Sequence, residues 1–258
     1  MSELVTLQIE GAVATITLNR AEKLNALTQD MIDALGDYAE QIDGDAGIRC
    51  AILTGTGDKA FCVGADILAW SALTPLDMWR RWIRRGHRVF DQLARLRVPM
   101  VAAINGHALG GGLELAATAD IRVADPRASF GLPEATIATV PGWSGTQRVT
   151  GLIGAGHVKY MALTGRRLSA EEALRVGLVQ QVADAGSALA AAQAIAADIC
   201  RLAPVSAQLT KQLIDGASGD GLAAALEGMA GALTGTTQDA AEGLASFREK
   251  RAAHYSGQ

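Results

Sequence analysis

The sequence predicts an α/β fold in which a mixed core of strands and helices is followed by a helical C-terminal region. Strand-like and helix-like segments alternate over the first part of the chain, and helical patterns fill almost all of the last third. The chain has 258 residues, of which 49% are hydrophobic and 19% charged, so it is long enough to bury a core without disulfide or metal support.

The strand signals lie in the first half of the chain. Residues Val5–Glu10 and Val13–Leu18 are rich in β-branched residues around Gly11, which predicts a hairpin. Three short apolar runs predict buried strands: Cys50–Leu53, Met100–Ile104 and Ile121–Ala124.

Helical spacing is clearest between and after these strands. Thr28 is a typical N-cap for a helix whose apolar residues run from Met31 to Ile42. Pro75–Arg97 predicts one long helix with Trp79, Ile83, Phe90 and Leu93 on one side. Ala- and Leu-rich runs predict further helices over Ala188–Arg201, Val205–Leu213, Leu222–Leu233 and Ala240–Lys250. We therefore expect a core over residues 1–190 and a helical region over 191–258.

Composition excludes several classes of protein. The formal net charge is −4, which gives no general attraction to phosphate backbones, so nucleic acid is not expected as a partner. No run is long and apolar enough for a membrane span, and the start of the chain lacks the basic segment of a secretion signal. Cys50, Cys62 and Cys200 are far apart, which predicts a reducing, cytoplasmic location. The scattered cysteines and histidines give no metal-ligand spacing.

Two glycine-rich loops follow predicted strands, at residues 53–66 and 105–114. In the first, Gly55, Gly57 and Ala60 fit a dinucleotide-binding pattern, but no helix is predicted directly after them. The second, NGHALGGGLE, places three glycines at the mouth of a helix. Such a place has unpaired N–H groups suited to an oxyanion hole, although tight packing explains the glycines equally well.

Two acidic residues stand in apolar surroundings near the second loop. Glu114 falls on the first turn of the predicted helix, within LELAATA, and Glu134 follows Phe130–Pro133. Burial would raise the pKa of each carboxyl group and make it usable as an acid or base near neutral pH. Each glutamate alone fits a surface position as well, but their joint presence beside the glycine loops favours a functional site.

These segments resemble the crotonase, or enoyl-CoA hydratase/isomerase, superfamily nearly from end to end. The resemblance rests on ordered motifs: ITLNRAEKLNALT at 16–28, AFCVGADI at 60–67, INGHALGGGLELAATADIRVA at 104–124, FGLPEATIATVPGWSGTQR at 130–148, LTGRRLSAEEALRVGLV at 163–179 and FREKRAAHY at 247–255. It implies a crotonase-like spiral of β-β-α repeats, with C-terminal helices that assemble homotrimers or dimers of trimers.

The resemblance also implies the chemistry. It suggests an enoyl-CoA hydratase-like lyase of fatty acid metabolism, with coenzyme A as part of the substrate and no metal or redox cofactor. The backbone N–H groups of Ala65 and Gly111 match the family's oxyanion hole, and Glu114 and Glu134 match its two catalytic acids. The remaining matches are to substrate-binding positions: Leu24, Ala26, Asp66, Ile67, Leu68, Gly142 and Trp143.

The chain departs from the family pattern beside the expected acyl pocket. PGWSGTQ stands where PGAGGTQ is common, so Trp143 and Ser144 replace small residues. An indole at this position would either select short or flat acyl groups or pack inside the protein. The alternatives to hydration are enoyl-CoA isomerisation, another acyl-CoA reaction of the family, RNA binding, and a dinucleotide-dependent oxidoreductase. An arginine-rich helix at residues 80–88 suits either CoA phosphates or a solvated face.

Overall fold

The computed structural model describes residues 3–216 and 222–258, so Met1 and Ser2 of the acidic start lie outside the described part. Its strands form two sheets. The larger sheet has the order β1-β2-β3-β5-β7-β10, from strands Val5–Glu10, Val13–Leu18, Cys50–Gly55, Met100–Ile104, Ile121–Ala124 and Gln181–Val182. The smaller sheet has the order β4-β6-β8-β9, from strands Ala60–Cys62, His107–Leu109, Ser129–Gly131 and Leu168–Ser169.

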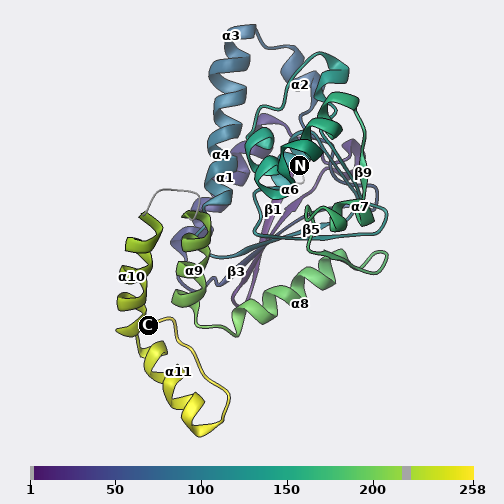
Figure 1. Cartoon of the computed structure of the whole chain (residues 1–258). Coiled ribbons are helices and arrows are strands. Elements are labelled where there is room, and N and C mark those ends of the chain that lie inside the picture. Colours follow the sequence, from purple (N-terminus) through teal and green to yellow (C-terminus); the bar gives the residue numbers. More distant parts are fainter. Residues whose placement is uncertain (1–2, 217–221) are drawn as a thin grey trace.

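Helices connect and cover these sheets (Figure 1). Those of the first half are η1 (Ala21–Lys23), α1 (Gln29–Gly44), α2 (Ile67–Ser71), α3 (Pro75–Asp77), the π-helical turn η2 (Met78–Ile83), α4 (Arg84–Ala94) and α5 (Gly111–Ala116). Those of the second half are η3 (Glu134–Ile137), α6 (Gly145–Thr164), α7 (Ala170–Arg175), α8 (Ala188–Cys200), α9 (Pro204–Gly216), α10 (Leu222–Gly235) and α11 (Gln238–Glu249).

The chain spirals because successive strands alternate between the two sheets. β3 joins the larger sheet and β4 the smaller one, and the same alternation repeats for β5 and β6 and for β7 and β8. Neighbouring strands of successive turns pair in parallel, and helical segments connect the turns. The predicted spiral α/β fold is confirmed.

Side-chain size determines how the helices cover the larger sheet. α8 packs its small residues Ala192 and Ala196 against Ile52, Val101 and Ala103. The main hydrophobic core lies on the other side and includes apolar residues of α1, α4 and the smaller sheet. Because α8 begins at Ala188, the division expected at residue 190 falls inside a helix that contacts the sheet.

The prediction of one regular helix over Pro75–Arg97 was partly wrong. The segment is helical from Pro75 to Ala94, but η2 interrupts it. A π-helical turn holds more residues than an α-helical turn and therefore shifts which side chains face the core. Trp79, expected on the buried side, is 54% exposed, whereas Trp82 is buried. The prediction also missed α2 and the two- and three-residue strands, which are too short to carry a periodic pattern.

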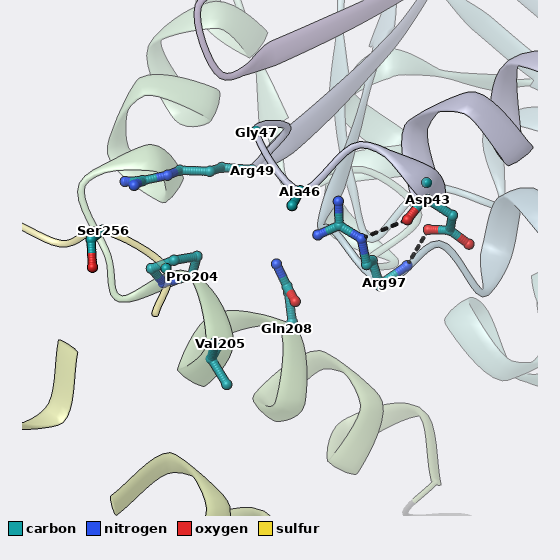
Figure 2. Close-up of a pocket in the computed structure, with 11 residues that line it drawn as sticks. Asp43, Ala46, Gly47, Arg49, Arg97, Pro204, Val205, Gln208 and Ser256 are labelled. Carbon is teal, nitrogen blue, oxygen red and sulfur yellow. Dashed lines mark hydrogen bonds between the residues drawn. The ribbon is translucent and has the colours of Figure 1, made fainter. Parts of the chain in front are cut away.

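The C-terminal helices α9, α10 and α11 lie to one side of the sheets, and the chain end returns toward them (Figure 1). Arg49 ties this region to the core, because its guanidinium donates to the carbonyl oxygens of Cys200 and Tyr255 at 3.2 and 2.9 Å. A cavity of about 300 Å³ lies beside this contact. Figure 2 shows Arg97 of the cavity wall hydrogen-bonded to Asp43.

No single described helix is long and apolar enough to span a membrane. Helices α8 and α9 reach the required length and hydrophobicity only when they are taken together, and the chain bends by 110° between them.

A buried ion pair anchors α9 and generates a stability prediction. Lys211 contacts Asp120 at 2.5 Å and donates to the Ala94 carbonyl, while Asp120 also accepts from the Met100 N–H. Lys211→Met leaves the Asp120 carboxylate largely buried without its cation, so we expect the free energy of unfolding to fall by about 1–3 kcal/mol at pH 7. Urea unfolding measures this change.

The matched control is Lys159→Met, which removes an exposed lysine and should change stability by less than about 0.5 kcal/mol. Burial raises the pKa of Asp120, and Lys211 lowers it. Without Lys211 the pKa of Asp120 rises further. The loss in free energy of unfolding caused by Lys211→Met should therefore become smaller as the pH falls and Asp120 becomes protonated. An equal loss in both lysine variants would contradict the anchoring role of the pair.

Candidate active site

Three neighbouring strands of the smaller sheet end at the same place. β4, β6 and β8 are parallel, so their carboxyl ends lie along one edge. The chain after β4 carries Ala65, the chain after β6 carries Gly111 and Glu114, and the chain after β8 carries Glu134. The topology therefore brings together four residues that are up to 69 positions apart in the sequence. Carboxyl ends of parallel strands are common ligand sites in α/β proteins.

The first two loops touch through their glycines. Gly64 has a φ of +98°, and a Cβ atom there would lie 3.0 Å from the Leu109 carbonyl oxygen and 3.1 Å from the Gly111 nitrogen. A Cβ on Gly112 would lie 2.0 Å from the Cys62 carbonyl oxygen. Only glycines permit this approach of backbone to backbone. The sequence offered two explanations for these glycines, close packing and an oxyanion site. The close contact of the loops is compatible with both.

The two touching loops carry the backbone N–H groups of Ala65 and Gly111, which line one cavity. The residues on either side of Ala65 are hydrogen-bonded to Leu27. The Leu27 N–H donates to the Gly64 carbonyl oxygen, and the Asp66 N–H donates to the Leu27 carbonyl oxygen, both at 2.8 Å. Gly111 is the first residue of α5, where a helix has no internal acceptor for its N–H. Among the described residues, neither the N–H of Ala65 nor that of Gly111 has a backbone acceptor.

Glu114 is buried and held by backbone donors. Its Oε1 accepts from the N–H of Trp143 at 2.8 Å and from the N–H of Gly145 at 2.7 Å. Burial raises the pKa of this carboxyl group, and the hydrogen bonds from the 142–145 backbone oppose that rise, with help from the charge of Arg148. The pKa of Glu114 is raised overall, but by less than burial alone would raise it.

Glu134 is buried without such donors. Neither of its carboxylate oxygens has a hydrogen-bond partner among the described residues. Burial, with a smaller contribution from the charge of Glu114, raises the pKa of Glu134 to about 7. The carboxylate lies over Gly110, where a Cβ would be 3.1 Å from Oε1. The two glutamates thus share a site but differ in their hydrogen-bonding environments, and such an asymmetry is how one site separates an acid from a base.

A cavity of about 340 Å³ joins these groups. Its walls include Gly64, Ala65, Gly111, Glu114, Glu134 and Trp143. The mouth carries exposed Ile67, while Leu68, 80% exposed, lies on the outer face of α2. Of the predicted site residues, the structure therefore brings the four proposed catalytic groups, Ile67, Gly142 and Trp143 to one cavity. It places Leu24, Ala26 and Asp66 in loops that support the cavity rather than in its wall.

These supporting loops use residues that the sequence analysis missed. Arg20 donates to the Asp66 carboxylate at 2.7 Å and to the Ala26 carbonyl at 2.8 Å. The amide of Asn25, which is fully buried, donates to the carbonyls of Thr56 and Ala60. Asp66 also accepts from the N–H groups of Leu68 and Ala69, so it both braces the loop and caps α2. The motif NRAEKLNAL contained Arg20 and Asn25, but nothing in it indicated these distant partners.

Trp143 lies across one end of the cavity. A Cβ on Gly111 would be 2.6 Å from the six-membered ring of its indole, and a Cβ on Gly86 would be 2.3 Å from its Nε1. The indole also packs against Trp82 and Phe90, with ring centroids 5.6 and 5.1 Å away. The sequence left open whether Trp143 faces the acyl pocket or packs inside the protein. In the structure it does both, because it lines the cavity and packs against core residues.

Other charged and polar side chains of interest lie outside this cavity, and Arg80, Arg81, Arg85 and Arg88 line a separate cavity of about 490 Å³. On the arginine-rich helix, Arg85 pairs with Asp33 at 2.6 Å. His107 shares a hydrogen bond with Ser129 at 2.9 Å and does not line the cavity. Within residues 3–216 and 222–258, no three acidic, histidine or cysteine side chains gather as metal ligands would.

Comparisons with known proteins agree with this geometry. Residues 8–258 match the enoyl-CoA hydratase/isomerase family. The short-chain-enoyl-CoA hydratase of Clostridium acetobutylicum is 39% identical over 249 residues, which cover 96% of this chain and 95% of that protein. The crotonyl-CoA hydratase of Syntrophomonas wolfei is 35% identical, with 98% of both chains covered. A crystal structure of an enoyl-CoA hydratase from Bacillus anthracis superposes with a TM-score of 0.95 and 37% identity, covering 99% of this chain and 100% of that one.

The fold and the loop-lined cavity define a crotonase-type enzyme. The chain belongs to the enoyl-CoA hydratase/isomerase family. The predicted recognition, fold class and assignment as a hydratase-like lyase are therefore confirmed.

Proposed function

We propose that this enzyme adds water across the double bond of short 2-enoyl-CoA thioesters to give 3-hydroxyacyl-CoA, and catalyses the reverse dehydration. One observation carries the proposal. Two buried carboxyl groups with opposite hydrogen-bonding environments, Glu114 and Glu134, line one cavity with two unpaired backbone N–H groups. Addition of water to an enoyl thioester needs a base, an acid and stabilisation of the thioester oxygen.

The N–H groups of Ala65 and Gly111 would stabilise that oxygen. As water attacks the β carbon, electrons move through the double bond and negative charge builds on the thioester oxygen. Two donors already fixed in place by the contact of Gly64 with Gly111 need no rearrangement to meet this charge. Each preorganised donor of this kind typically contributes about 2.7–4 kcal/mol to the barrier reduction.

The two glutamates would divide the proton transfers. Ionised Glu114 accepts a proton from water as its oxygen bonds to the β carbon. Glu134, with its pKa raised to about 7, carries a proton that it delivers to the α carbon. Exchange with solvent then returns both carboxyl groups to their starting states. Positioned proton transfer of this kind contributes roughly a hundred- to ten-thousandfold to the rate.

Isomerisation of a double bond is the alternative that the same cavity permits. It needs one group to move a proton between carbons, and Glu134 alone would suffice. The backbone donors that hold Glu114 as a carboxylate favour hydration, because isomerisation gives that arrangement no role. An isomerase would convert 3-enoyl-CoA to 2-enoyl-CoA without a change in mass, whereas hydration adds one water.

The first prediction concerns the two carboxyl groups. Glu114→Gln and Glu134→Gln should each lower kcat for crotonyl-CoA at least a hundredfold and leave KM within about threefold, because each removes a transition-state contact. Since the Glu134 proton is consumed in hydration, kcat of the native enzyme should fall as the pH rises above about 7. Loss of thioester absorbance and the mass of the product give these rates.

Glu171→Gln is a suitable control, because this glutamate is exposed on α7 and lies outside the cavity. It should keep the native rate and the native pH dependence. Hydration at the native rate in either cavity variant would refute the assigned roles. If only Glu134→Gln lost activity, the isomerase alternative would gain.

Trp143 supports the restriction to short acyl groups. Its indole is wedged between Gly111 and Gly86, so it closes the cavity beside the proposed oxyanion donors. The relatives named for short-chain-enoyl-CoA and crotonyl-CoA act on short thioesters by their names. We therefore propose that acyl groups of about four carbons fit and that longer straight chains meet the indole.

The second prediction tests this wall. Trp143→Leu should raise kcat/KM for octenoyl-CoA relative to crotonyl-CoA by roughly tenfold, because it opens space beyond the β carbon. Trp79→Leu removes an exposed tryptophan of η2 that does not line the cavity, and it should leave the ratio unchanged. Equal changes for both substrates in the Trp143 variant would show that the indole only packs the core.

We also propose that the protein assembles as a homotrimer or a dimer of trimers. Large apolar side chains are exposed along α10 and α11: Leu226, Leu233, Leu244 and Phe247, the last 85% exposed. Exposed apolar groups on this scale suit a protein interface.

Light scattering of the native protein should give a mass of three or six chains, and Phe247→Asp should lower that mass. A monomeric native protein would contradict the proposal.

A further inference from the structure

Ser144 has a backbone conformation that serine rarely adopts. It lies directly before α6 with φ +75° and ψ 15°, in the left-handed region that favours glycine. Its neighbours Trp143 and Gly145 supply the two N–H groups that bond to Glu114 Oε1. The strained residue thus stands between the two donors that hold the proposed catalytic base.

A ring of polar contacts surrounds Ser144 and connects it to two helices. Its hydroxyl lies 2.9 Å from Nδ1 of His87 on α4, and Nε2 of His87 lies 3.5 Å from the Asp91 carboxylate. Asp91 bonds in turn to Arg148 on α6. The guanidinium of Arg148 donates to the Trp143 carbonyl oxygen at 3.4 Å. The backbone N–H of Arg148 donates to the Ser144 carbonyl oxygen at 2.9 Å, which closes the ring.

The ring offers a physical reason for the strained conformation. A left-handed serine costs free energy that a glycine would not, so contacts elsewhere must hold it. The hydroxyl of Ser144 is buried, and its partner in the described structure is His87. His87 itself is partly exposed and does not line the cavity, so it has no direct access to the reacting atoms.

We infer that Ser144 and His87 are positioning residues, which hold the 143–145 backbone so that both of its N–H groups point at Glu114. This inference rests on the proposed role of Glu114 as the base. Ala65 and Gly111, which would bind the thioester oxygen, belong to other loops. Disturbing the ring should therefore affect the chemical step more than binding of the thioester.

The charge on Glu114 gives a specific readout. The N–H groups from 142–145 lower the pKa of Glu114, opposing the rise caused by burial, and Arg148 lowers it further. The other charged residues that line the cavity are Glu134 and Arg167. If the donors turn away, the pKa of Glu114 rises and its carboxylate forms only at higher pH. The acidic limb of the kcat profile should then move to higher pH.

The test compares two substitutions of one residue. Ser144→Ala removes the hydroxyl but leaves a residue that disfavours the left-handed backbone conformation. We therefore expect kcat to fall about tenfold with KM nearly unchanged. The acidic limb of the kcat profile should move to higher pH by about one pH unit. Ser144→Gly also removes the hydroxyl but adopts the left-handed conformation freely, so it should restore kcat and the pH profile. A role in packing alone would instead make glycine as harmful as alanine or more so.

His87→Gln tests the other side of the ring without altering the 142–145 backbone. It should resemble Ser144→Ala when made alone and should have little further effect in the Ser144→Gly protein, where the ring is no longer needed. A native profile in Ser144→Ala and His87→Gln would overturn the inference, as would equal losses from His87→Gln in both backgrounds. Glu114→Gln, measured in parallel, separates the two proposals: native activity in that variant refutes the proposed base itself.

Discussion

The contact between Gly64 and Gly111 is the constraint on which the active site depends. A side chain on Gly64 would meet the Leu109 carbonyl and the Gly111 nitrogen, so the ends of β4 and β6 can approach this closely only through glycine. That approach places the Ala65 and Gly111 N–H groups together and starts α5 at the cavity. Because α5 begins there, Glu114 in its first turn faces the cavity instead of solvent.

The second feature of the site is the unequal treatment of two carboxyl groups that are both buried. Desolvation raises the pKa of both Glu114 and Glu134, and hydrogen bonds from the 142–145 backbone oppose that rise at Glu114. Glu114 receives backbone donors from Trp143 and from Gly145 at the start of α6, whereas the Glu134 carboxylate oxygens have no hydrogen-bond partner within the described residues. In the proposed mechanism, the geometry of the 142–145 backbone therefore favours Glu114 as the base and leaves Glu134 as the acid. Trp143, in the same segment, also forms part of the cavity wall, so in the proposed mechanism this loop would link reactivity to substrate size.

The sequence predicted the parts of this arrangement that local pattern encodes. β-branched residues predicted the hairpin of β1 and β2, apolar runs predicted β3, β5 and β7, and acids in apolar surroundings marked Glu114 and Glu134. The spiral topology came from the family resemblance alone, because pairing between distant strands leaves no local signal. Periodicity placed Trp79 in the core since it assumes a regular helix, and the π-helical turn exposed Trp79 and buried Trp82. The partnership of Ser144 with His87 joins residues 57 positions apart and could not be predicted from either neighbourhood.

Isotope transfer from water tests the central claim most directly. When crotonyl-CoA is incubated with the enzyme in ¹⁸O-labelled water, hydration by the carboxyl pair predicts 3-hydroxybutyryl-CoA with the label in the new hydroxyl group. In D₂O, one deuterium should appear at the α carbon, where Glu134 delivers its proton. A hydroxyl group without the label, or a shifted double bond with no added oxygen, would contradict the addition of water as the reaction of this enzyme.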